Sequence, residues 1–201
     1  MRSLPLVLAS TSPYRRELLA RLQIPFAVIA PEVDETPLPG EAPEATALRL
    51  SQLKAQAVQA AYPHALIIGS DQVATLQGHQ IGKPGTHAKA VEQLRLMRGK
   101  SVVFHTALAL YNSASGRMHT TSVPTTVHYR DLSDAQILGY LNKDTPYNCA
   151  GSARIESLGI ALIEKLDGAD PSALVGLPLI TLARMLTAEG LDVLTWQASP
   201  A

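Results

Sequence analysis

Residues 4–22 read LPLVLASTSPYRRELLARL, and this stretch predicts a strand, a short loop and a helix in immediate succession. The uninterrupted apolar run from Leu4 to Ala9 is typical of a strand that is buried on both faces. Ser12 suits the N-cap of a helix and Pro13 its first position, and leucines then follow at helical spacing. A buried strand that leads directly into an amphipathic helix indicates an α/β fold.

The rest of the chain continues this alternation. The first helix is expected to end near Gln23, and further helices are expected over Glu44–Ala61, Ala88–Arg98, Ser133–Asn142 and Pro178–Glu189. Further strands are expected over Phe26–Ile29, Leu66–Ile68, a hairpin within Val73–Ile81, Ser101–Tyr111, Met118–Tyr129 and Ile160–Leu166. We therefore expect an α/β fold with a mixed twisted sheet and flanking helices. It would form one domain over residues 1–196, followed by a C-terminal tail over residues 197–201.

Composition excludes several classes of protein. The 201 residues include 17 Lys and Arg against 17 Asp and Glu, which disfavours a surface for polymeric nucleic acid. A hydrophobic fraction of 46% is too high for a disordered chain. The most apolar uncharged run, residues 172–183, falls short of the ~20 residues that span a membrane. Cys149 is the single cysteine and cannot form an internal disulfide, so a cytoplasmic location is expected.

The start of the first predicted helix carries unusual charges. Arg15 and Arg16 fall in or next to its first turn, where cations oppose the helix dipole. A bound phosphate would offset that cost, held by free backbone N–H groups, the arginines and the hydroxyls of Ser10 and its neighbours. Two arginines that are simply solvated remain the alternative.

A second candidate site follows the strand Leu66–Ile68, where Asp71 and Gln72 come directly after apolar residues. Ligands of α/β sheets bind beyond the carboxyl ends of strands, although an aspartate there can also serve only to form a turn. An acidic loop that follows the strand expected at Phe26–Ile29 could supply carboxylates that hold Mg²⁺ together with Asp71. Mg²⁺ prefers one or two carboxylates together with substrate phosphates. The acidic residues of that loop are Glu32, Asp34 and Glu35.

Two lysines could complete a phosphate clamp. Lys54 lies in a predicted helix and Lys83 in a Gly-Lys-Pro turn that has little backbone freedom. Each lysine alone, like the acidic loop alone, is more often a solvated surface feature. The sequence therefore predicts a phosphate site only if these separate segments converge in the fold.

Seven segments together resemble the Maf-like nucleotide pyrophosphatase family, in its order and at its spacings. They are LASTSPYRRELL, APEVDET, LKAQAV, IIGSDQV, GKP, AGSARIESLGI and ALVGLPL. The resemblance implies a Maf/ITPase-like fold with two lobes around a central cleft. It also implies a cytoplasmic homodimer that uses a divalent metal cation, Mg²⁺ or Mn²⁺, to hydrolyse nucleoside triphosphates to monophosphates and pyrophosphate.

The resemblance also implies roles for single residues. Asp71 would be the catalytic acid/base residue, and Glu35 would hold the metal together with Asp71. The phosphates would be contacted by Ser10, Arg15, Lys54 and Lys83.

Three positions separate the subgroups of this family, and here they are Tyr14, Gln72 and Glu156. Members that act on dTTP and UTP carry arginine, threonine and glutamine there, so the chain resembles the branch linked to 7-methyl-GTP. Physical reasoning agrees, because Tyr14 can hold a positively charged 7-methylguanine ring by cation–π contact and Glu156 can accept its N–H groups. A dTTP/UTP pyrophosphatase and a non-catalytic nucleotide-sensing regulator of cell division remain the alternatives.

Overall fold

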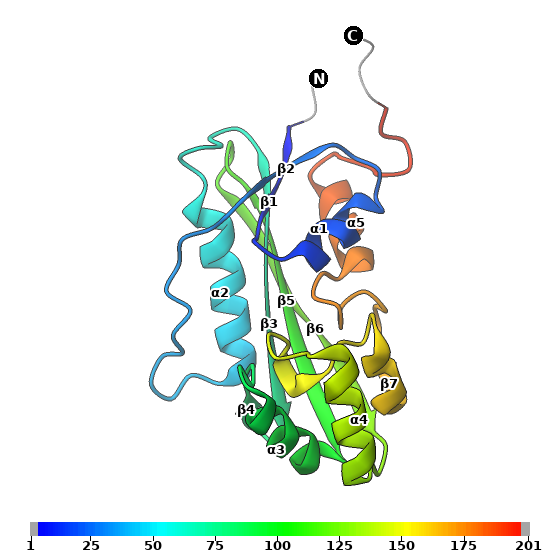
Figure 1. Cartoon of the computed structure of the whole chain (residues 1–201). Helices are drawn as coiled ribbons and strands as arrows, with labels where there is room; N and C mark the ends of the chain where they lie inside the picture. Colours follow the sequence, from blue (N-terminus) through cyan, green and yellow to red (C-terminus); the bar gives the residue numbers. More distant parts are fainter. Residues whose placement is uncertain (1–3, 198–201) are drawn as a thin grey trace.

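The computed structural model describes residues 4–197, which form a mixed sheet with helices packed against it (Figure 1). The strands are β1 (Leu6–Ala9), β2 (Phe26–Ile29), β3 (Leu66–Leu76), β4 (His79–Ile81), β5 (Ser101–Asn112), β6 (Arg117–Tyr129) and β7 (Ile163–Gly168). The helices are α1 (Pro13–Ala20), α2 (Pro43–Ala57), α3 (His87–Met97), α4 (Asp134–Asp144) and α5 (Leu179–Ala188), and the short 3₁₀ segments are η1 (Ala150–Ser152) and η2 (Leu158–Leu162).

The sheet confirms the predicted α/β class. Its strand order is β2-β1-β3-β5-β6-β7, and β4 pairs with β3. β1 runs parallel to β2 and β3, whereas every other pairing is antiparallel. The result is a parallel portion at one end of the sheet and long antiparallel strands that continue beyond it.

β3 is much longer than the strand predicted at Leu66–Ile68. The apolar run ends at Gly69, but β5 pairs with β3 from Leu66 to Thr75, so the strand continues through polar residues. Asp71 therefore lies in the middle of a strand, and its predicted position beyond a strand end is wrong. The apolar pattern marked only the part of β3 that is buried on both faces.

A gap in strand pairing lies beside Asp71. β1 pairs with β3 as far as Gly69, and β4 pairs with it from Ala74 onward. Within the described residues, the intervening positions 70–73 have β5 on one side and no strand on the other. The carboxyl end of β1 borders this gap, so the site that was expected at a strand end still forms there.

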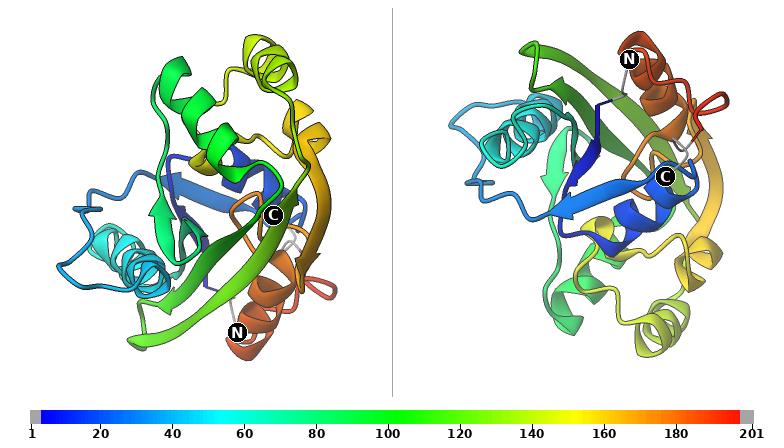
Figure 2. Two further views of the ribbon diagram at one scale, coloured as in Figure 1. Left: turned by 90° about the horizontal axis from the view of Figure 1, so that it is seen from below. Right: turned by 90° about the horizontal axis from the view of Figure 1, so that it is seen from above.

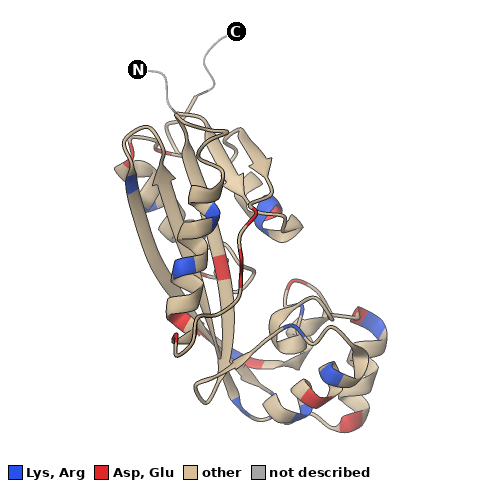
Figure 3. Ribbon diagram, turned by 90° about the vertical axis from the view of Figure 1, so that its left-hand side faces the viewer, with Lys and Arg blue, Asp and Glu red and all other residues tan. Residues whose placement is uncertain are grey.

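The molecule has two lobes, which lie apart in the side view of Figure 3, whereas Figure 2 looks along the direction in which they are stacked. In the larger lobe α2 covers one face of the sheet, and α1 and α5 cover the other. Alternate residues of β1 face these two layers, Leu6 and Leu8 toward α1 and α5, and Val7 and Ala9 toward α2. Neither sign of charge dominates either lobe in Figure 3.

The smaller lobe contains α3, α4 and the 3₁₀ segments, packed on the far ends of β3, β5 and β6. The helix predicted from Ser133 is α4, and it begins with a complete capping box between Ser133 and Gln136. The strand predicted at Ile160–Leu166 is instead η2 followed by β7, because backbone turns continue to Leu162.

Other differences concern helix ends. α1 ends at Ala20, three residues before Gln23, which adopts a left-handed backbone with φ of 56°. α2 ends at Ala57, and the residues after it form isolated turns. None of the helices within residues 4–197 combines the length and the apolar character that crossing a membrane requires. Most of the predicted tail over residues 197–201 lies outside the described residues.

Candidate active site

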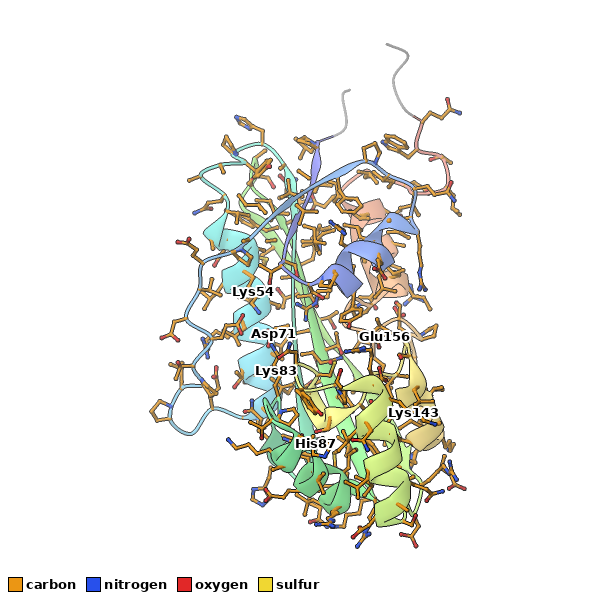
Figure 4. All side chains as sticks on the ribbon, in the orientation of Figure 1. Lys54, Asp71, Lys83, His87, Lys143 and Glu156 are labelled. Atoms are coloured by element: carbon orange, nitrogen blue, oxygen red, sulfur yellow. The ribbon has the colours of Figure 1, made fainter. Side chains whose placement is uncertain are left out.

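One cavity of about 800 Å³ lies between the two lobes. Its lining brings together nine of the residues predicted for the site: Ser10, Tyr14, Arg15, Glu35, Lys54, Asp71, Gln72, Lys83 and Glu156. Figure 4 shows Lys54, Asp71 and Lys83 close together and Glu156 on the other side of the cavity. Segments that are far apart in the sequence therefore converge on one cavity, which is the condition for a phosphate site.

Lys54 bridges two carboxylates at the centre of the cavity. Its Nζ lies 2.6 Å from Oδ1 of Asp71 and 2.7 Å from Oε1 of Glu35. The side chains of Lys54 and Asp71 are 8% and 12% exposed, whereas that of Glu35 is 57% exposed. The hydrogen bond from Lys54, followed by the charges of Lys54, Lys83 and Arg15, lowers the pKa of Glu35. Lys54 is therefore a buried charge of the cavity wall, unlike an ordinary surface lysine.

Gly69 explains how Lys54 reaches Asp71. A Cβ at Gly69 would collide with the backbone oxygen of Ser51 and would lie 2.8 Å from the backbone nitrogen of Ala55. Glycine thus lets α2 pack directly on β3. Asp71 lies two residues further along the strand and so points to the same face, toward α2.

Arg15 is held from behind by the chain that precedes α5. Its Nε donates to the backbone oxygen of Gly176 over 2.8 Å, and the buried Ser70 Oγ donates to the same oxygen over 2.8 Å. Burial lowers the pKa of Arg15, while the charges of Asp71 and Glu35 oppose this effect. Ser10 is 4% exposed and accepts a hydrogen bond from the backbone of Ser12.

Gln72 is fixed by three acceptors. Its Nε2 lies 2.8 Å from Thr106 Oγ1, 3.2 Å from the oxygen of Ala173 and 3.0 Å from that of Leu174. Thr106 in turn donates to Ala173 over 2.9 Å. The orientation of the Gln72 amide is therefore set by Thr106 together with two backbone oxygens. Sequence reasoning missed Thr106, because a buried threonine within a strand carries no signal of a site.

The cavity has two ends of different composition, which we call the phosphate end and the base end after the substrate groups that the family resemblance leads us to expect there. The phosphate end comprises Ser10, Arg15, Glu35, Lys54, Asp71 and Lys83. The base end comprises Tyr14, Cys149, Arg154 and Glu156. Burial raises the pKa of Tyr14, and Arg154 and Glu156 are both close enough to act on it electrostatically. Cys149 is partly buried and also lines the cavity.

Comparison with known proteins gives a consistent answer. The family model described as Maf-like protein matches residues 5–189. This chain belongs to the Maf-like family. Proteins named 7-methyl-GTP pyrophosphatase are 62% identical to it in Thiobacillus denitrificans (96% of each chain) and 62% identical in Methylobacillus flagellatus (94% of this chain, 99% of that one). A third, from Cupriavidus metallidurans, is 58% identical over 92% of this chain and 93% of that one.

Among solved structures, the Staphylococcus aureus Ham1 protein aligns with this Maf-like chain at a TM-score of 0.46 and 16% identity. The alignment covers 63% of this chain and 72% of that one.

Some predicted residues of this Maf-like protein lie elsewhere. Arg16 is exposed and, unlike Arg15, is absent from the cavity lining. Of the three acidic residues of the loop, Glu35 lines the cavity, whereas Glu32 and Asp34 are absent from its lining and Asp34 accepts from the backbone of Thr36 over 2.9 Å. The arginine pair thus contributes only Arg15 to the cavity lining, and the acidic cluster contributes only Glu35. Neighbouring residues of one turn face different directions, so they do not all reach the cavity.

Asp71 and Glu35 are the carboxylates that could hold a divalent cation. The described residues contain no group of three or more His, Cys, Asp or Glu side chains with the arrangement of a metal site. Asp71 and Glu35 nevertheless converge on a single cation, the Lys54 ammonium. Magnesium commonly takes one or two carboxylates and completes its shell with phosphate oxygens and water, and this pair fits that pattern.

Proposed function

We propose that this Maf-like protein hydrolyses 7-methyl-GTP to 7-methyl-GMP and pyrophosphate, and so clears modified nucleotides. The observation that carries the proposal is that Tyr14, Gln72 and Glu156 line the same cavity as the bridged carboxylates Asp71 and Glu35. Relatives that share most of its length bear the corresponding name.

The base end suits a positively charged ring. Tyr14 offers an aromatic face, and cation–π contact of this kind contributes about 0.5 to 2 kcal/mol. Glu156 can accept the N1–H and exocyclic N–H groups of the ring while balancing its charge. The Gln72 amide nitrogen is already engaged by Thr106 and two carbonyls, so only its oxygen is left to accept from the substrate.

The phosphate end suits attack on the α-phosphorus. Asp71 accepts the proton of the attacking water as the new P–O bond forms and the bond to the β-phosphate breaks. Arg15, Lys54 and Lys83 stabilise the charge that develops on the departing pyrophosphate. When bound by Asp71 and Glu35, a divalent cation supplies further positive charge to the phosphate oxygens.

The same proposal includes the use of Mg²⁺ or Mn²⁺, a cytoplasmic location and a homodimeric assembly. They are supported by the resemblance to the family, and the carboxylate pair additionally supports the metal. A single small anion with its metal is the partner that this cavity suits, and neither a polymeric nucleic acid nor a membrane is expected.

The test is a pyrophosphate-release screen over 7-methyl-GTP, GTP, dTTP and UTP with Mg²⁺ or Mn²⁺. We expect kcat/KM for 7-methyl-GTP to exceed that for dTTP and UTP by about ten-fold. Asp71→Asn should reduce release by about 10³-fold, because it removes the proton acceptor and a metal ligand. Asp131→Asn, an exposed aspartate outside the cavity, is the matched control and should leave the rate unchanged.

Two outcomes would contradict the proposal. A preference for dTTP or UTP would assign the protein to the pyrimidine branch. Tight binding of 7-methyl-GTP without turnover, together with a cell-division phenotype that survives Asp71→Asn, would favour the nucleotide-sensing role.

A further inference from the structure

An ion pair stands behind the base end of the cavity. Arg154 lines the cavity, and its Nη1 donates to Oδ1 of Asp144 over 3.0 Å. The Asp144 side chain is 5% exposed and lies behind Arg154, outside the cavity lining. Ser157 Oγ donates to the same Oδ1 over 3.0 Å. Asp144 is thus a buried carboxylate. In the described part of the chain it forms its ion pair with Arg154, a residue of the cavity wall.

This pair changes the charge that a base would meet. Arg154 is a cation and Glu156 an anion, so these two lining residues alone would balance each other. Asp144 adds a second anion directly against Arg154 and leaves the carboxylate of Glu156 uncompensated. Tyr14 adds no charge, because it is a neutral phenol near pH 7. The base end as a whole therefore carries one net negative charge, opposite to that of a 7-methylguanine ring.

We propose that Asp144 is a specificity-determining residue that acts through Arg154. By neutralising Arg154 it makes the base end favour a cationic purine over a neutral one. The proposal rests on the proposed function and deepens it, since without Asp144 the charge of Glu156 would only offset that of Arg154 and the base end would be neutral toward a cationic ring. Asp144 itself does not touch the base and is a positioning residue.

The test compares 7-methyl-GTP with GTP, which carry the same triphosphate and differ in the charge of the base. In the ratio of their kcat/KM values, contributions from the phosphate end cancel. Asp144→Asn keeps an oxygen that can accept from Arg154 and Ser157 but removes the charge, and should lower this ratio by about ten-fold. A merely structural role would lower both activities together, and an unchanged ratio would therefore overturn the proposal.

A second variant keeps the proposal testable if Asp144→Asn folds poorly. Arg154→Gln removes the cation that Asp144 is said to neutralise, so the ratio should stay at the wild-type value or rise. A fall in the ratio would show that Arg154 itself recognises the methylated base, and would sink the idea. The double variant Asp144→Asn with Arg154→Gln should return the ratio to within about two-fold of wild type, since both charges are gone.

Asp134→Asn is the matched control, because Asp134 lies on the same helix, α4, and pairs with exposed arginines away from the cavity. It should leave the ratio unchanged. Binding of 7-methyl-GMP and GMP, measured by titration calorimetry, gives the same comparison without turnover. If wild-type protein releases no pyrophosphate from 7-methyl-GTP, the proposed function fails, whereas release with an unchanged ratio in Asp144→Asn refutes only the role of Asp144.

Discussion

The two ends of the cavity are built differently. At the phosphate end, Arg15, Lys54 and Asp71 stand on α1, α2 and β3, and backbone or buried side-chain contacts hold each of them. At the base end, Arg154 and Glu156 stand between two 3₁₀ segments, and Glu156 is exposed. The difference teaches that Arg15, Lys54 and Asp71 are fixed by regular structure, whereas Arg154 and Glu156, proposed to act on the base, lie on irregular chain.

Replacing Lys54 and Lys83 in turn is the strongest test of this difference between fixed and exposed groups. Lys54→Met should lower the free energy of unfolding by about 3 kcal/mol, because it leaves the buried Asp71 without its cation. Lys83→Met removes an exposed lysine and should change stability by less than about 0.5 kcal/mol. Both should reduce pyrophosphate release, by about 10²-fold or more for Lys54 and less for Lys83. Urea unfolding and steady-state rates provide the two measurements, and equal losses of stability would contradict the contrast.

Gly176 tests how the phosphate end is supported from behind. Its backbone has φ of +116°, and a Cβ there would lie 3.3 Å from Nε of Arg15. Gly176→Ala should therefore cost about 2 kcal/mol of stability and reduce kcat by about ten-fold as Arg15 shifts. Gly139→Ala is the control, since nothing lies within 4 Å of a Cβ at that position of α4. A variant of Gly176 with wild-type kcat would show that the position of Arg15 is not set by this contact.

The smallest expected effect concerns the loop that carries Glu35. Glu41 accepts hydrogen bonds from Arg49, Thr46 and the backbone of Leu38, and Arg49 also donates to the oxygen of Thr36. These contacts, led by the one from Arg49, lower the pKa of Glu41 to about 2. The ionised carboxylate therefore stabilises the fold above its ordinary pKa of about 4.3, and this contribution is lost as pH falls toward 2.

Glu41→Gln should accordingly lower Tm by about 2 °C at pH 7, with a difference that shrinks steadily below about pH 4. Thermal melts of both proteins across that range measure it. A difference that is independent of pH would mean that shape rather than charge accounts for the contribution of Glu41.

Sequence alone predicted most of the elements and nine residues that the fold brings to one cavity, because apolar runs, caps and the family-like segments are local signals. It did not predict that Asp71 lies in mid-strand, since the pairing that extends β3 comes from β5, far along the chain. It also missed Arg154, although this residue lies only two positions before Glu156. Its relevance depends on Asp144, and an ion pair between a helix and a loop leaves no pattern in the sequence.

The gap between β1 and β4 along β3 has a consequence for protein engineering. Asp71 and Gln72 lie in that gap. At these positions β3 is hydrogen-bonded to β5, and its other edge pairs with no strand of the described residues. The segment from Asn148 to Ser157 makes no ladder with this part of β3. A designer seeking a different nucleotide preference can therefore begin with the exposed Glu156 of that segment, whose replacement disturbs no strand pairing of β3, and keep the buried Gly151 and Ser152.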